Sequence, residues 1–246
     1  MLLSRLGITF PAAFPAAGFS LFKPGKTLRK QSGQSGQAGI ELLIVWPVIV
    51  AAVFTFVQAL IIWWGQQTLT VANQYAVRAG SINNGSHNAM VNTLVAGMAG
   101  LKPQLSTDNK MVAVTEALVE QRLHYAQFGR LKVLSPTVED FRQFADWRWD
   151  DELKAEVLEI SVDHYHARAS SDGSEQWHQA RVLVIETYWC LPLDIPIAGE
   201  FLSATQTLLS DSKAARYCAT RSRVFNKPLW ALSNTAQHSM LSGYRK

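Results

Sequence analysis

The chain has 246 residues, of which 48% are hydrophobic and 17% charged, with 15 Gly and 9 Pro spread along it. This composition excludes a collagen-like and a wholly disordered protein. The formal net charge is +4, but residues 1–36 and 213–246 contain basic residues and no acidic ones, so all 19 acidic residues lie between them. Because the positive charge flanks an acidic body, and no basic stripe with interleaved aromatics accompanies it, we expect no nucleic-acid partner.

The segment from Leu42 to Trp64 has 23 residues without a formal charge. At a rise of about 1.5 Å per residue, a helix of this length crosses a hydrocarbon core of about 30 Å. A secretory signal would have a shorter apolar core followed by small residues, whereas Trp63 and Trp64 suit a membrane interface. The sequence therefore predicts one membrane-spanning helix in a lipid bilayer. The five basic residues before it, against Arg78 alone between Gly65 and Ala79, predict a cytoplasmic N-terminus.

Glu41 lies at the edge of this apolar run, where a carboxylate is costly and functional by default. Gly36 lies immediately before Gln37-Ala38-Gly39-Ile40-Glu41, behind a basic leader. This arrangement resembles the processing site of type IV prepilins. In such proteins a membrane peptidase cuts after the glycine, and the glutamate becomes residue five of the mature chain.

The N-terminal motif Gly36-Gln37-Ala38, with Glu41 and with Pro47 six residues further on, resembles the TadE-like pseudopilins of the tight-adherence (Flp) pilus and secretion apparatus. Three later segments are similar to the periplasmic part of that family: Leu134-Ser-Pro-Thr-x-x-x-Phe141-x-x-Phe144, Ala180–Tyr188, and Leu191-x-x-x-x-Pro196. The resemblance implies a non-enzymatic minor pseudopilin of the bacterial inner membrane, without a cofactor. Its implied partners are a prepilin peptidase, other pilins or pseudopilins, and Tad inner-membrane proteins.

A cut after Gly36 gives Gln37 a new α-amino group, four residues from Glu41. In an apolar environment, the ammonium of one subunit and the carboxylate of its neighbour would attract each other strongly. We therefore expect Gln37 and Glu41 to form a subunit-pairing contact that fixes the axial register of an assembly.

The predicted organisation is a cytoplasmic leader (1–36), a TadE-like transmembrane helix and stalk (37–80), and a periplasmic α+β head (81–246). The membrane helix is expected to continue through Gln66–Ala79 and to end at Gly80. A second helix is predicted from Ser86, as N-cap, to about Leu101. A third is predicted from Thr107 to about Gln127, with these apolar residues facing inward: Val112, Leu118, Val119 and Leu123.

Alternating apolar and polar residues over Val157–His166 and Ala180–Trp189 predict a β-hairpin, and a further strand is predicted over Ala215–Arg223. The expected fold class is thus α+β, with a long N-terminal transmembrane helix that continues into a periplasmic head of helices packed on a small antiparallel sheet. Cys190 and Cys218 both lie in the predicted periplasmic part. An oxidising compartment permits a disulfide between them, and they lack the close spacing of metal ligands.

Two other functions remain open. The chain could be an uncleaved single-pass envelope scaffold, or a membrane-anchored periplasmic metal-dependent hydrolase with His164 and His166 on one strand face and His178 across the hairpin. No nucleophile or nucleotide-binding motif accompanies these histidines, so we predict no catalytic residue and no metal site. Four tryptophans are interpreted as core or interface residues: Trp147, Trp149, Trp177 and Trp189.

Overall fold

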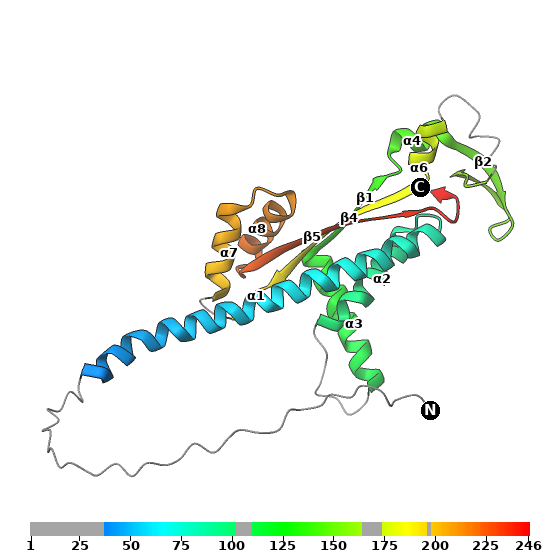
Figure 1. Cartoon of the computed structure of the whole chain (residues 1–246). Coiled ribbons are helices and arrows are strands. Elements are labelled where there is room, and N and C mark those ends of the chain that lie inside the picture. The colour runs from blue at the N-terminus through cyan, green and yellow to red at the C-terminus, as the bar shows by residue number, and fades with distance from the viewer. Residues whose placement is uncertain (1–36, 102–109, 164–173, 196–197) are drawn as a thin grey trace, which may run out of the picture. The chain divides into compact units, whose positions relative to one another are not determined.

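The computed structural model describes residues 37–101, 110–163, 174–195 and 198–246. The chain divides into two compact units, Met1–Leu43 and Ile44–Lys246. The second unit contains almost all of the described residues. Its fold class is α+β, as the sequence predicts: a long apolar helix is followed by helices and small antiparallel sheets (Figure 1).

The first element, α1 (Gln37–Ile82), is a single helix of 46 residues. The predicted continuation of the membrane helix is therefore confirmed, and α1 ends two residues beyond Gly80. Gly85 then reverses the chain with a φ of 74°, and its N–H donates to the Gly80 carbonyl at 2.8 Å. A side chain at Gly85 would collide with the ring of Tyr244, so this position requires glycine for space as well as conformation.

The second predicted helix is confirmed as α2 (His87–Met98), which a short 3-10 turn, η1 (Ala99–Leu101), follows. The predicted cap is also present, because the Ser86 hydroxyl accepts a hydrogen bond from the Ala89 N–H. The helix crosses α1 closely at Gly97, where an added Cβ would lie 2.6 Å from the Cβ of Ala72. Two small residues thus allow α2 to pack directly against α1.

The third predicted helix is confirmed as α3 (Lys110–Phe128), although its predicted start at Thr107 lies outside the described residues. Its predicted inward face is wrong. The four residues expected inside are exposed: Val112, Leu118, Val119 and Leu123. Ala117, Gln121 and Phe128 are buried instead, at helical spacing. Apolar residues lie on more than one face of α3, so the sequence pattern does not determine which face meets the core.

In the part of the chain that the structure describes, six strands form two antiparallel sheets. The larger sheet has the order β1-β4-β5, with β1 (Gly129–Ser135), β4 (Val182–Pro192) and β5 (Leu229–Ser239). The smaller sheet has the order β2-β3-β6, with β2 (Ala145–Asp150), β3 (Ala155–Ile160) and β6 (Tyr244–Arg245). The described residues also include the helices α4 (Val138–Phe144), α6 (Ser174–Ala180), α7 (Ala198–Leu209) and α8 (Lys213–Phe225).

The predicted β-hairpin is wrong, although both of its strands exist. β3 pairs with β2 and β6, whereas β4 pairs with β1 and β5, so the two strands belong to different sheets. The helix α6 precedes β4, in the segment that was expected to connect the two hairpin strands. Alternation identifies a strand but not its partner, because partners are chosen by contacts between distant parts of the chain.

The predicted strand over Ala215–Arg223 is also wrong, because this segment is the helix α8. The Ser212 hydroxyl caps its start by accepting from the Ala215 N–H at 3.1 Å, and Asn226 ends it in the left-handed conformation. Ala214, Ala215 and Cys218 are buried on one side. Their three-to-four-residue spacing is helical rather than alternating.

The main core lies between the C-terminal half of α1, α2 and the larger sheet. From α1 it takes Leu69, Ala72, Ala76 and Val77, all of which are buried. From the sheet it takes Leu183, Ile185, Trp189 and Leu232. The C-terminal half of α1 is therefore part of the head, and the strands β4 and β5 extend alongside it (Figure 1).

Candidate functional site

The outstanding surface feature is the apolar exterior of α1 between Ile44 and Trp64. Its exposed large residues include Ile44, Trp46, Ile49, Phe54, Phe56, Leu60, Trp63 and Trp64. Within the described residues, the segment Leu43–Ile82 is long and apolar enough to cross a membrane, and only 6% of its most apolar window is buried. A core helix of a soluble protein would be mostly buried, so this surface is suited to a lipid bilayer.

The predicted processing residues lie at the start of this helix. Gly36 is outside the described residues, and α1 begins at Gln37. Glu41 follows in the second turn of α1, and the structure does not describe the side chains of either Gln37 or Glu41. The cut after Gly36 and the pairing of Gln37 with Glu41 therefore stay predictions.

A buried polar network, centred on Asn73, fixes α1 to the larger sheet. Asn73 is fully buried; its Nδ2 donates to the carbonyl of Asn234 at 3.1 Å and to Asn234 Oδ1 at 2.9 Å. Its Oδ1 accepts from the hydroxyl of Thr187, also fully buried, at 2.7 Å. Thr187 and Asn234 are cross-strand neighbours in β4 and β5. Because a shift of α1 would leave these groups unpaired, the Asn73 network sets the position of the helix on the sheet.

The head also contacts α1 further toward its N-terminus, at Gln58 and Gly65. Gln58 is only 1% exposed, and its Oε1 accepts from the Ile195 N–H at 3.3 Å. A Cβ added at Gly65 would lie 3.2 to 3.3 Å from side chains of Leu232 and Leu191. These contacts lie toward the C-terminal end of the apolar run, all of which the sequence analysis placed in the lipid bilayer. The sequence signal for this contact was Gln58, whose amide side chain stands alone in the apolar run.

Cys190 and Cys218 are joined by a disulfide, with their Cα atoms 5.5 Å apart. Both are buried in a small cluster with Phe128 and Leu229. The bond connects the end of β4 to α8, so it holds the α7–α8 region against the larger sheet.

The hairpin that was to bring three histidines together does not form. His178 lies on α6, where its ring is 5.2 Å from that of Trp177, and His164 and His166 lie outside the described residues. Among the residues that the structure does describe, no three His, Cys, Asp or Glu side chains are grouped as metal ligands. The predicted position of His178 across a hairpin is therefore wrong, whereas the hydrolase alternative itself is not tested by the described residues.

An ion-pair cluster at the smaller sheet was missed. Arg245 contacts Asp150 at 2.5 Å and Glu159 at 2.8 Å, and Glu159 is buried. The backbone N–H of Leu153, followed by the Arg245 guanidinium, lowers the pKa of Asp150 below its usual value. Asp150 was not singled out in the sequence, because its partner Arg245 lies at the far end of the chain.

The four tryptophans divide into two pairs. Trp177 and Trp189 are buried, as core residues would be, whereas Trp147 and Trp149 are largely exposed on β2. The Trp149 indole donates to Asp151 Oδ1 at 3.1 Å. Trp147 and Trp149 share one face of β2, two residues apart.

No protein-family model, no curated protein and no solved structure matches this chain. The resemblance to TadE-like pseudopilins therefore depends on the residues quoted for it. In the second quoted segment, Thr137 and Asp140 form a capping box at the start of α4, and Phe141 and Phe144 pack against the main core.

Proposed function

We propose that this chain is a TadE-like pseudopilin of the bacterial inner membrane. In this proposal it is inserted with its N-terminus in the cytoplasm, cut between Gly36 and Gln37 by a prepilin peptidase, and assembled with other pilins into a Flp-type pilus or related secretion filament. The observation that supports it most is the division of α1. One half presents an exposed apolar surface and the other half is locked into the head.

This division suits a subunit that exists in two environments. Before assembly, the exposed apolar surface of α1 is covered by lipid. In a filament the same surface is covered by the equivalent helices of other subunits, so no new apolar surface has to meet water. The Asn73 network keeps the head at a fixed position along the helix during this transfer. An ordinary anchor also needs the apolar surface, but it needs neither Gly36 nor Glu41.

The processing step provides the direct test. The chain is expressed in cells with and without a prepilin peptidase, and the N-terminus of the membrane-bound protein is determined by mass spectrometry. We expect Gln37 as the first residue only when the peptidase is present. Gly36→Val should abolish the cut, and the control Gly33→Val should leave it unchanged. An intact N-terminus in peptidase-containing cells would instead favour the uncleaved envelope scaffold.

The orientation is tested separately with a reporter that is active only in the periplasm. We expect activity when it is fused after Lys246 and none when it is fused at Lys30, because the basic leader should stay in the cytoplasm. The reverse result would contradict the proposed topology and place the predicted cleavage site on the wrong side for the peptidase.

A further inference from the structure

The helix α7 has an exposed apolar stripe. Phe201, Ala204 and Leu208 are spaced three and four residues apart, so they lie along one face of the helix. Phe201 is 61% exposed and Leu208 is 84% exposed. On another face, Gln206 accepts from the Ala231 N–H at 2.7 Å and donates to the Ala231 carbonyl at 3.0 Å. These two bonds tie α7 to β5 and fix the direction in which the stripe points.

The start of α7 lies beside the apolar half of α1. Ile195, three residues before α7, donates its N–H to Gln58 of α1. From Ile44, a path of about 30 Å through hydrocarbon needs about 20 helical residues and ends near Trp63. The path from Ile44 to Val57 gives only about 21 Å. If α1 crosses the bilayer from Ile44, Gln58 therefore lies about 9 Å inside the outer boundary of the hydrocarbon, and the chain packed on it lies at the same depth.

The direction of α7 is consistent with this depth in the membrane. In the view of Figure 1, α7 runs at a steep angle to α1 rather than along it, and its start lies beside the part of α1 that contains Gln58. A helix that crosses a membrane-spanning helix lies roughly in the plane of the membrane. Such a helix can bury an apolar stripe at the boundary between headgroups and acyl chains.

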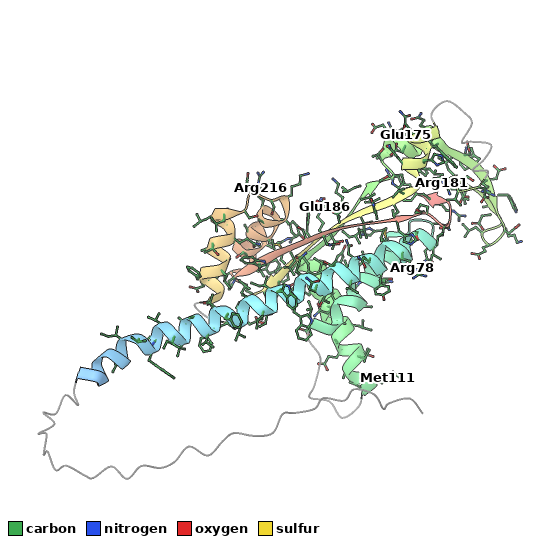
Figure 2. The ribbon with its side chains drawn as sticks, viewed as in Figure 1. Arg78, Met111, Glu175, Arg181, Glu186 and Arg216 are labelled. Atoms are coloured by element: carbon green, nitrogen blue, oxygen red, sulfur yellow. A yellow bond between two sulfur atoms is a disulfide. The ribbon has the colours of Figure 1, made fainter. Side chains whose placement is uncertain are left out.

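The charges next to α7 favour lipid as the occupant. The segment 198–227 has five basic residues and two acidic ones. A cavity of about 240 Å³ between α7 and α8 is lined by Thr207, Arg216 and Arg223, among others. Arg216, which pairs with Asp211 at 2.7 Å, lies at the α7–α8 end of the head (Figure 2). Guanidinium groups beside an apolar stripe are complementary to anionic phospholipid headgroups above acyl chains.

We propose that α7 is an interfacial helix, with Phe201, Ala204 and Leu208 in the outer leaflet of the bilayer that α1 crosses and with the basic side chains of α8 against anionic headgroups. This inference depends on α1 spanning the membrane and does not depend on processing or filament assembly. It gives the head a fixed orientation on the membrane, because α1 supplies the axis and α7 prevents rotation about it.

The test uses the full chain in vesicles of phosphatidylcholine and phosphatidylglycerol, with Cys190 and Cys218 left oxidised. An environment-sensitive fluorophore is attached to a single added cysteine in Leu208→Cys, and lipids with a nitroxide on the acyl chain quench it. Leu241→Cys is the matched control: Leu241 is 62% exposed, but its N–H donates to Ser81 at the other end of the head. Val53→Cys, on the exposed part of α1, reports insertion itself.

We expect quenching of the Leu208 probe to be several-fold stronger than that of the Leu241 probe and to approach that of the Val53 probe. Arg223→Glu in the Leu208→Cys background should reduce it. Strong quenching at Val53 with equal, weak quenching at Leu208 and Leu241 would overturn the proposal. Crosslinking between copies through residue 208, in place of quenching, would also overturn it, since a second copy would then cover the stripe.

Discussion

Truncating Asn73 to alanine should uncouple α1 from the larger sheet. Asn73→Ala removes three hydrogen bonds, at 2.7, 2.9 and 3.1 Å, and leaves the buried Thr187 hydroxyl without its acceptor. A buried donor without a partner costs about 1 to 3 kcal/mol, and the lost amide leaves a small cavity. We expect a loss of about 2 to 4 kcal/mol in the free energy of unfolding of the head.

The assay is thermal unfolding of the full, disulfide-intact chain in detergent micelles, followed by near-ultraviolet circular dichroism. For a domain of this size, the expected loss lowers Tm by about 4 to 16 °C. Asn83→Ala is the matched control, because the exposed Asn83 amide donates to the Ala79 carbonyl at 2.8 Å. We expect it to change stability by less than about 0.5 kcal/mol.

If the buried hydrogen bonds are the source of this stability, the effects of substitutions at Asn73 and Thr187 should not be additive. Thr187→Val alone should destabilise the head, because it leaves Asn73 Oδ1 without its donor. In the Asn73→Ala background the same change removes the orphaned hydroxyl, so it should cost little or nothing. If the two single effects simply add, the network is not the source of the stability, and the reasoning is refuted.

Three further outcomes are expected. Glu41→Gln should be inserted and cut like the parent, because a charge costs about 2.5 to 3.5 kcal/mol at the helix centre and less at the edge, where Glu41 lies, and the amide lowers that cost. The variant should fail to co-purify with other pilins, and normal assembly would contradict the pairing role. Replacing Cys190 and Cys218 by alanine should lower the free energy of unfolding by about 3.6 kcal/mol, because the disulfide closes a loop with a sequence separation of 28 in the unfolded chain. Equal thiol labelling of denatured protein with and without reductant would show that the bond is absent. Because the pKa of Asp150 is lowered in the folded state, its contribution to stability should be complete above the ordinary carboxyl pKa of about 3.9 and should be lost as the pH falls through the folded-state pKa. Stability measured against acidic pH that is the same for the parent and for Asp150→Asn would contradict this.

The features that the sequence alone determined are those that depend on neighbours along the chain. The apolar run from Leu42 to Trp64 and its continuation through α1 could be predicted because helix length and charge are local properties. The Ser86 cap and the strand character of β3 and β4 could be predicted for the same reason. The fold class follows from these elements, since a helix and a strand each need another element to cover their apolar faces.

Only the tertiary structure decided which elements meet. The Arg245 contact with Asp150 and Glu159 joins residues that are far apart in the chain, and nothing beside Asp150 marks it. The separation of β3 and β4 into different sheets has the same cause, because strand pairing depends on long-range packing that alternation cannot encode. The contact between Gln58 and Ile195 places the start of α7 beside the apolar part of α1. No local sequence pattern predicts this contact. A helix fixes the spacing of its own residues but does not determine which part of the head packs beside each turn.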